Sequence, residues 1–204
     1  MNLSVYFVTP DNPAEALVLA ALRGGAGVVQ LRDKHATDEE MIAKALRIKE
    51  MTDAHKVPLI INDRVAVAKA IDAAGLHIGQ SDGDPVVMRE AIGPDKILGL
   101  SIENEDQLVA MKALPEGTID YIGAGPIRAT ATKTDAADPI GFEALGRICE
   151  ASPVATVAIG GIGKADIAAL KALGCAGLSV VSAISAAEDP EAATRDLVKE
   201  WSKA

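Results

Sequence analysis

Aromatic side chains and positive charge are both scarce in this chain of 204 residues. Aromatic residues make up 2% of the sequence, which leaves almost no material for the stacked-base platforms of single-strand nucleic-acid binders. The 20 Lys and Arg residues are outnumbered by 29 Asp and Glu residues, and the formal net charge is -9. Such a chain repels phosphate backbones as a whole. We therefore expect no nucleic-acid partner, and any phosphate must be bound locally.

Cysteines and long apolar runs are scarce as well. Cys149 and Cys175 are far apart in the sequence and form no C-x-x-C pair, which argues against a disulfide framework and a thiolate metal site. We expect both to be small buried hydrophobic residues. No run approaches the ~18 consecutive apolar residues of a membrane span, and residues 1–10 do not resemble a signal peptide. The expected compartment is the cytoplasm, with no membrane partner.

What the chain does contain is a regular alternation of short apolar runs and helical segments. Hydrophobic residues make up 49% of the sequence, enough for a sizeable core. Eight runs have the length and composition of strands, and Ala/Leu/Lys/Glu-rich segments with helical spacing separate them. The expected strands are 5–8, 28–31, 59–61, 76–78, 97–100, 121–122, 154–159 and 177–181.

Eight βα units without a linker predict one α/β domain over residues 1–204, a (β/α)8 TIM barrel. An open doubly wound sheet is the alternative, but no G-x-G-x-x-G motif follows the first strand. Local signals mark helix starts: a Thr37…Glu40 capping box, and proline at Pro13, Pro85 and Pro190.

Polar residues at the ends of these strands need an explanation, because a parallel barrel buries both faces of its strands and builds its active site at their carboxyl ends. After the second strand, Gln30, Arg32 and Lys34 share one face if the backbone stays extended, while Leu31 takes the other. Two cations and an amide at the barrel mouth favour a phosphate or pyrophosphate. A solvated polar face beyond the sheet is the alternative.

Two carboxylates follow the next two strands. Asp63 comes after Asn62, and Asp82 follows the fourth strand. Mg2+ prefers one or two carboxylates together with substrate phosphate oxygens and water, so the pair is a candidate magnesium site. Alternatively, both residues cap the helices that follow.

The later strands are followed by glycine-rich and hydroxyl-rich segments. A long irregular stretch, 123–134, contains hydroxyl groups and Lys133, which could close over an anionic ligand. The alternative is a surface connection without a functional role. The segments 160–163 and 181–182 follow strands seven and eight, the recurrent phosphate site of this fold. The glycines can otherwise serve turn geometry alone.

Histidine and serine give weaker signals. His35, His55 and His77 lack the paired spacing of a metal site, and we expect His77 to be structural. Ser101 ends the fifth strand and has no His or Asp beside it in the sequence to activate it, so we expect a hydrogen-bonding contact rather than a nucleophile.

Taken in order, several segments resemble one family. They are 6–9, 29–34, 60–64, 77–82, 125–127 with 130–133, 158–162 and 181–184. The chain resembles thiamine phosphate synthase over nearly its whole length. The resemblance implies a TIM barrel that joins hydroxymethylpyrimidine pyrophosphate to a thiazole phosphate, giving thiamine phosphate and pyrophosphate.

The resemblance also implies a set of site residues. Asp63 and Asp82 look like ligands of the cofactor Mg2+, and Arg32, Lys34, Ser101 and Lys133 are the expected catalytic residues. The expected substrate-binding residues are Gln30, Leu31, Arg32, Asp33, Lys34, Asn62, Ser101, Thr130, Ala131, Thr132, Lys133, Gly161, Val181 and Ser182. The implied reaction is dissociative: pyrophosphate leaves first, and the thiazole nitrogen captures a pyrimidine cation.

Two positions depart from the family pattern. Arg128 stands where an aromatic residue is common, and Glu103 where a histidine is frequent. Two other functions are compatible with the same barrel: a thiazole tautomerase-like paralogue, which typically lacks the Thr-x-Thr-Lys segment, and a non-catalytic phosphate-sensing barrel. The sequence does not predict an oligomeric state.

Overall fold

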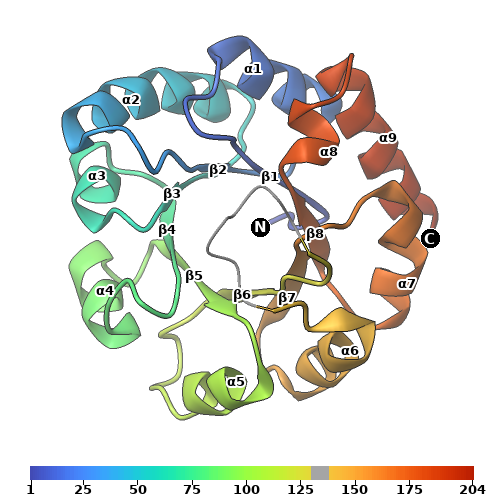
Figure 1. Cartoon of the computed structure of the whole chain (residues 1–204). Helices are drawn as coiled ribbons and strands as arrows, with labels where there is room; N and C mark the ends of the chain where they lie inside the picture. Colours follow the sequence, from blue (N-terminus) through green and yellow to red (C-terminus); the bar gives the residue numbers. More distant parts are fainter. Residues whose placement is uncertain (130–137) are drawn as a thin grey trace.

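Eight parallel strands form a closed barrel in the computed structural model, which describes residues 1–129 and 138–204 (Figure 1). Each strand pairs with its neighbour in the sequence, and β1 also pairs with β8, which closes the ring. The predicted TIM barrel is therefore confirmed and the open sheet is excluded. The strands are β1 Val5–Val8, β2 Val28–Leu31, β3 Leu59–Asn62, β4 Gly75–Ile78, β5 Ile97–Ile102, β6 Tyr121–Ala124, β7 Ala155–Ile159 and β8 Gly177–Val180.

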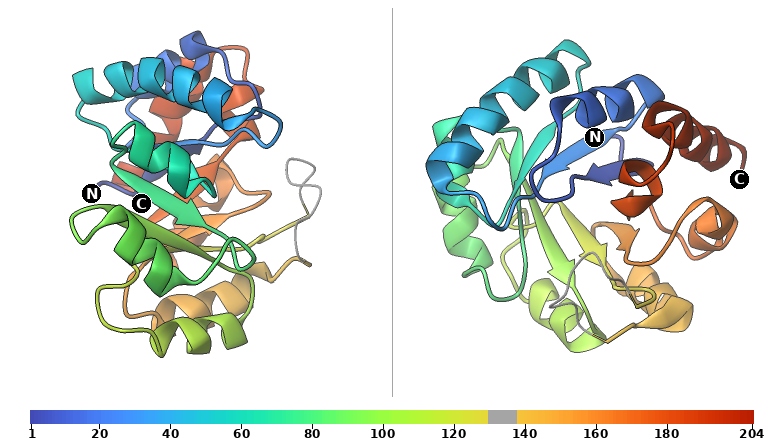
Figure 2. Two further views of the ribbon diagram at one scale, coloured as in Figure 1. Left: turned by 90° about the vertical axis from the view of Figure 1, so that its left-hand side faces the viewer. Right: turned by 45° about the horizontal axis from the view of Figure 1, so that its top comes forward.

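Helices surround this ring on the outside, as the two further views in Figure 2 also show. They are α1 Glu15–Gly24, α2 Asp38–Ala54, α3 Val65–Ala70, α4 Pro85–Ile92, α5 Glu105–Lys112, α6 Gly141–Ala151, the 3-10 turn η1 Lys164–Asp166, α7 Ile167–Ala172, α8 Ser182–Ser185 and α9 Pro190–Lys203. Among the described helices, none is long and apolar enough to cross a membrane.

Local sequence signals fix most of the predicted helix starts. The Thr37 hydroxyl accepts a hydrogen bond from the Glu40 N–H while the Glu40 side chain accepts one from the Thr37 N–H, which confirms the capping box. Pro85 and Pro190 occupy first-turn positions behind aspartate caps. The prediction for Pro13 was wrong, because α1 begins at Glu15 behind Ala14.

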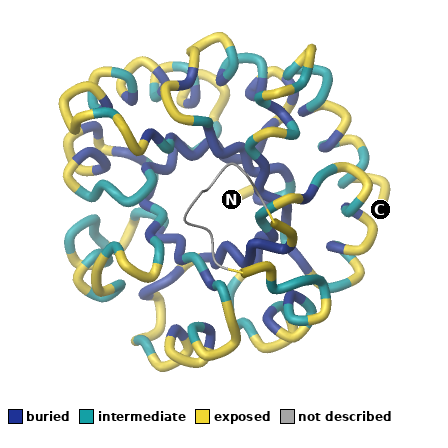
Figure 3. Tube along the Cα trace, viewed as in Figure 1, coloured by how far each residue is buried: buried dark blue, intermediate teal, exposed yellow. Residues whose placement is uncertain are grey.

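The core has two layers, because side chains alternate between the two faces of each strand. Phe7 belongs to the large outer cluster between strands and helices, whereas Tyr6 and Val8 belong to the inner cluster. Figure 3 shows the strands as a ring of buried chain. The inner cluster consists of Leu3, Tyr6, Val8, Val28, Ile60, Tyr121 and Val157. The barrel is thus filled, and room for a ligand must lie at its mouth.

Candidate active site

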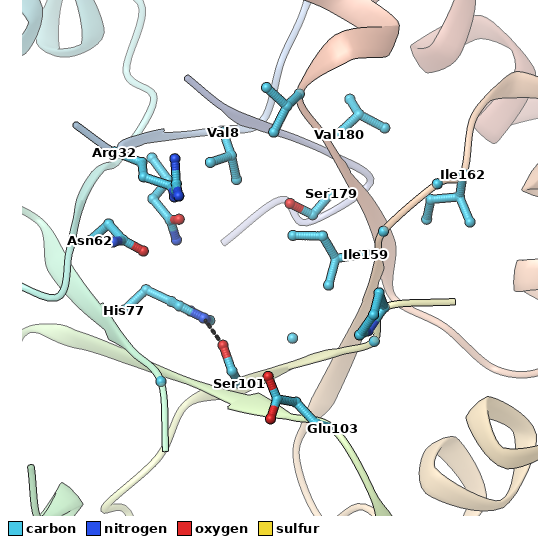
Figure 4. A pocket seen from close by; sticks show the side chains of 18 of the residues that line it. Val8, Arg32, Asn62, His77, Ser101, Glu103, Ile159, Ile162, Ser179 and Val180 are labelled. Atoms are coloured by element: carbon cyan, nitrogen blue, oxygen red, sulfur yellow. Dashed lines mark hydrogen bonds between the residues drawn. The ribbon is translucent and has the colours of Figure 1, made fainter. Parts of the chain in front are cut away.

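A cavity of about 760 Å³ opens where the carboxyl ends of the strands meet. Figure 4 shows Arg32 and Asn62 on one side of it and Ile159, Ile162 and Val180 on the other. The described lining residues are Val8, Gln30, Arg32, Lys34, Asn62, Asp63, His77, Gly79, Gln80, Ser81, Asp82, Ser101, Glu103, Gly123, Gly125, Pro126, Ala129, Ile159, Gly160, Gly161, Ile162, Ser179, Val180, Val181, Ser182 and Ala183. Both halves of the barrel therefore contribute to one cavity.

The end of β2 supplies two cations and an amide, as strand alternation predicts. Gln30, Arg32 and Lys34 all line the cavity. The guanidinium of Arg32 lies 3.3 Å from a carboxylate oxygen of Asp11, and its backbone N–H donates to the Thr9 hydroxyl at 3.0 Å. The segment after β1 thus holds the orientation of Arg32.

Leu31 and Asp33, which were also expected to bind substrate, are not among the described residues that line the cavity. Leu31 is fully buried in the outer core cluster. The Asp33 carboxylate is buried and accepts hydrogen bonds from Lys44 and from the backbone of Asn12, His35 and Ala36. Burial raises the pKa of Asp33, but these partners outweigh it and hold the pKa below its usual value. Asp33 therefore stabilises the turn that presents Arg32 and Lys34.

Asp63 and Asp82 come together in the cavity, with Lys34 beside them. The Lys34 ammonium lies 3.6 Å from Asp63 Oδ2, and Asp82 Oδ2 accepts a hydrogen bond from the Gly79 N–H at 2.7 Å. Burial and the neighbouring Asp82 raise the pKa of Asp63 to about 6, although Lys34 opposes the shift. Two carboxylates held this close repel each other, so the pair favours a bound cation or a shared proton.

The alternative role of these carboxylates as helix caps does not hold. The cap residue of α3 is Arg64, which forms no side-chain capping bond, and the cap of α4 is Asp84, whose carboxylate accepts from two backbone N–H groups. Asp63 also has a left-handed backbone, with φ of 61°, an uncommon conformation that recurs at functional sites. Across residues 1–129 and 138–204, no three His, Cys, Asp or Glu residues cluster as a metal site, so the pair stands alone.

His77 lines the cavity and connects two other polar groups, a role that the sequence analysis missed. One ring nitrogen lies 3.0 Å from the Ser101 hydroxyl (Figure 4) and the other 2.9 Å from the Tyr121 hydroxyl. Ser101 thus has a histidine partner in space, although none is adjacent in the sequence. Because the second nitrogen bonds a phenol rather than a carboxylate, this arrangement lacks the acid of a hydrolytic triad.

The same hydrogen-bond chain crosses the barrel floor to Gln30. The hydroxyl groups of Tyr121 and Tyr6 are 2.7 Å apart, and the Gln30 amide donates to the Tyr6 hydroxyl at 2.9 Å. Burial raises the pKa of both phenols well above the usual value, so both stay neutral. Two expected substrate-binding residues, Gln30 and Ser101, are therefore positioned by one buried network.

The opposite side of the cavity is formed by the backbone after β7 and β8. Gly161, Val181 and Ser182 all line the cavity there. Gly161 has φ of +67°, and a Cβ atom on it would lie 2.8 Å from the Cβ of Arg128. Only glycine suits this position, because the backbone is left-handed and the neighbouring segment is close. Thr130, Ala131, Thr132 and Lys133 lie outside the described residues.

The two departures from the family pattern occupy different surroundings. Glu103 lines the cavity. Arg128 instead ties the chain after β6 to the segment after β7: its guanidinium lies 2.6 Å and 3.0 Å from the two carboxylate oxygens of Asp166 and donates to the Gly161 carbonyl. It also lies over the Phe142 ring, 5.0 Å from the centroid.

Comparison with known proteins relates this geometry to one family. Residues 5–184 match the TMP-TENI family model, described as thiamine monophosphate synthase. The thiamine-phosphate synthase of Vibrio campbellii is 47% identical over 198 residues, which cover 95% of this chain and 96% of that protein. That of Solidesulfovibrio magneticus is 53% identical over 177 residues, or 87% of this chain and 82% of the relative.

Solved structures agree with the sequence matches. Thiamine phosphate pyrophosphorylase from Pyrococcus furiosus superposes with a TM-score of 0.89 at 32% identity, covering 99% of this chain and 96% of that one. A 3-hexulose-6-phosphate synthase shares the barrel alone, with 17% identity and a TM-score of 0.66. The chain belongs to the thiamine monophosphate synthase family.

Proposed function

We propose that this protein is a thiamine-phosphate synthase that joins a pyrimidinylmethyl pyrophosphate to a thiazole phosphate, releasing pyrophosphate. The observation that carries the proposal is that Arg32 and Lys34 line the same cavity of about 760 Å³ as Asp63 and Asp82. A pyrophosphate leaving group carries several negative charges, which cationic side chains and a metal ion held by a carboxylate pair can stabilise together. The relatives' shared activity supplies the identity of the two substrates.

The two sides of the cavity suit the two substrates differently. Gln30, Asn62 and Ser101 offer hydrogen-bonding side chains to a pyrimidine, close to the cations that would hold its pyrophosphate. Across the cavity, the backbone of Gly161, Val181 and Ser182 would receive the phosphate of the thiazole. Ile159 and Val180 provide apolar surface on this second side of the cavity.

In the proposed reaction the carbon–oxygen bond to pyrophosphate breaks first, and the thiazole nitrogen then bonds to the pyrimidine methylene carbon. Arg32, Lys34 and Lys133 stabilise the negative charge that develops on the departing pyrophosphate. Gln30 and Ser101, fixed by the buried tyrosine–histidine network, orient the pyrimidine ring. The protein forms no covalent bond to substrate in this scheme.

The carboxylate pair fits Mg2+. Asp63 and Asp82 are hard oxygen donors; burial and the neighbouring Asp82 raise the pKa of Asp63, and a divalent cation would relieve the repulsion between the two carboxylates. We assign both as its ligands. When bound, Mg2+ supplies charge neutralisation for the pyrophosphate oxygens.

The experiment that tests the proposal follows product formation directly. Purified protein is mixed with hydroxymethylpyrimidine pyrophosphate, thiazole phosphate and Mg2+, with and without EDTA, and thiamine phosphate and pyrophosphate are quantified. Equal formation of both products, abolished by EDTA and restored by excess Mg2+, is the expected result. Product formation that is unaffected by EDTA contradicts the metal assignment.

Asp63→Asn tests the metal ligand, and Asp72→Asn is its matched control. Asp72 also has a left-handed backbone, with φ of 50°, but its carboxylate pairs with Lys96 outside the cavity. Asparagine tolerates this backbone at both positions, so strain does not distinguish them. We expect Asp63→Asn to weaken the response to Mg2+ strongly, and Asp72→Asn to leave it unchanged.

The same assay separates the two other functions. A tautomerase-like protein forms no thiamine phosphate and does not bind the pyrimidine pyrophosphate. A phosphate-sensing barrel binds that substrate without turnover. If the protein forms no product, calorimetric titration with the pyrimidine pyrophosphate alone therefore distinguishes the two functions. Binding indicates a phosphate-sensing barrel, and no binding indicates a tautomerase-like protein.

A further inference from the structure

The two cysteines meet on the outside of the barrel, contrary to the separation that their sequence positions indicated. Cys149 lies in α6 and Cys175 just before β8, and their sulfur atoms are 3.4 Å apart. Both are free thiols, Cys175 buried and Cys149 partly exposed. Neither lines the cavity, so the proposed activity does not account for the pair.

The end of α7 sets the position of Cys175. Gly174 has φ of +84°, its N–H bonds the Lys171 carbonyl, and the N–H of Cys175 bonds the Leu170 carbonyl at 3.0 Å. These are the two hydrogen bonds of a Schellman motif, in which glycine supplies the left-handed residue. The next N–H, of Ala176, bonds the Thr156 carbonyl at 2.8 Å. Backbone hydrogen bonds before and after Cys175 thus fix its position, and its sulfur atom contacts that of Cys149 in α6.

The two thiols differ in the direction of their pKa shifts and in exposure. The hydrogen bond with Cys175, supported by one with Thr156, holds the pKa of the Cys149 thiol below its usual value. The hydrogen bond with Cys149 and burial raise the pKa of Cys175. Cys149 is also the more exposed of the two, so an external disulfide meets the better nucleophile first.

We propose that Cys149 and Cys175 are a reversible dithiol site that a small-molecule disulfide oxidises to an intramolecular disulfide. The sulfur atoms are 3.4 Å apart, so an S–S bond of about 2.0 Å requires them to approach by roughly 1.4 Å. This inference does not rest on the proposed activity.

The exchange takes two balanced steps. The Cys149 thiolate attacks one sulfur of glutathione disulfide, forming a mixed disulfide and releasing one glutathione thiolate. The Cys175 sulfur then attacks Cys149, forming the internal bond and releasing the second glutathione. Two protein thiols are oxidised, one glutathione disulfide is reduced to two thiols, and the two thiol protons pass through solvent to the released glutathiones.

The new bond would close a covalent loop around one structural unit. The chain between the cysteines contains β7, the segment 160–163 and α7. A disulfide restricts the unfolded chain over this length and so stabilises the folded form. The oxidised state should therefore differ from the reduced state first in thermal stability.

Peptide mapping of native protein treated with glutathione disulfide tests the proposal. Remaining thiols are blocked with N-ethylmaleimide, and the digest is analysed without reductant. We expect a peptide pair joined through Cys149 and Cys175, a loss of two hydrogens from the intact chain, and a Tm higher by roughly 5–10 °C. Dithiothreitol should reverse all three changes.

Single substitutions separate an internal disulfide from other oxidation. Cys175→Ala should leave a lasting glutathione adduct at Cys149 and no Tm increase, because the second step is lost. Cys149→Ala should give neither adduct nor cross-link. A lasting adduct on the unmodified sequence, a cross-link between two chains, or two thiols that remain reactive with N-ethylmaleimide overturns the proposal.

Discussion

The Arg128 guanidinium forms a two-contact ion pair with the Asp166 carboxylate, at 2.6 Å and 3.0 Å. Asp166 also accepts a hydrogen bond from the Gly163 N–H, and Arg128 donates to the Gly161 carbonyl. The hydrogen bond from Arg128 holds the pKa of Asp166 below its usual value, although burial opposes it. One ion pair therefore connects the chain after β6 with both ends of the glycine segment 161–163.

Removing this ion pair should affect binding of the thiazole phosphate. In Arg128→Gln the segment 161–163 loses a side-chain anchor, and we expect KM for that substrate to rise roughly two- to fivefold, the range for an exposed ion pair, with kcat little changed. Steady-state kinetics with each substrate varied in turn measures the effect.

Arg147→Gln is the matched control. Arg147 contacts two carboxylates, Glu105 and Glu143, and is 50% exposed, close to the 48% of Arg128. It lies away from the cavity, so its loss should leave both KM values unchanged. Equal effects of the two substitutions would show that Arg128 has no specific role in positioning the glycine segment.

Asp63→Asn should stabilise the metal-free protein at high pH. The folded pKa of Asp63 is about 6, above the ordinary value of 3.8, so the folded protein binds more protons between these values and its stability falls as pH rises through them. Above pH 6 the ionised carboxylate costs roughly 1–3 kcal/mol, which asparagine avoids. Urea unfolding with EDTA at pH 8 and pH 4 measures the difference.

The gain should be present at pH 8 and absent at pH 4. Asp72→Asn again serves for comparison, because Lys96 lowers the pKa of Asp72 and its loss cannot stabilise the folded state at pH 8. A metal-free Asp63→Asn protein that is no more stable than the unmodified chain at pH 8 would contradict the raised pKa.

Tyr121→Phe should weaken both stability and catalysis. Its hydroxyl bonds Tyr6 and His77, so the substitution leaves the buried Tyr6 hydroxyl and the half-buried His77 ring each short of one partner, at a cost of about 1–3 kcal/mol in unfolding free energy. Because His77 also bonds Ser101, we expect kcat to fall as well. Tyr6→Phe removes the bonds to Gln30 and Tyr121 but leaves the bond between Tyr121 and His77, so comparing the two variants distinguishes the two ends of the network.

Lys133→Ala should slow turnover by roughly 10²–10³, the scale for loss of one preorganised charge-stabilising donor. Lys164→Ala is its control, because Lys164 is exposed and pairs with Asp196. Single-turnover measurement of pyrophosphate release gives the result. Turnover within a factor of a few of the unmodified protein would mean that Lys133 has no such role.

The sequence predicted the barrel and much of the cavity because strand alternation is a local property. Gln30, Arg32 and Lys34 all line the cavity, as alternation along an extended backbone predicts, although β2 ends at Leu31, and Asp63 and Asp82 follow adjacent parallel strands. The resemblance added Gly161, Val181 and Ser182, which also line the cavity.

What the sequence did not reveal depends on contacts between distant segments. His77 and Ser101 meet because β4 and β5 pair, and Cys149 reaches Cys175 because the end of α7 turns back towards α6. The resemblance placed Asp33 among the expected substrate-binding residues. Its carboxylate instead bonds backbone N–H groups that spacing cannot identify.

Because the barrel closes between β1 and β8, the ribosome must synthesise the last strand before the first strand can complete its pairing. Phe7 pairs with Val180, and Val8 lines the same cavity as Val181 and Ser182. At ~5–20 residues per second, the ribosome releases β8 roughly 9 to 34 seconds after β1. The nascent chain therefore exposes an unpaired β1 edge throughout that interval, and the substrate cavity can form only after β8 has been released.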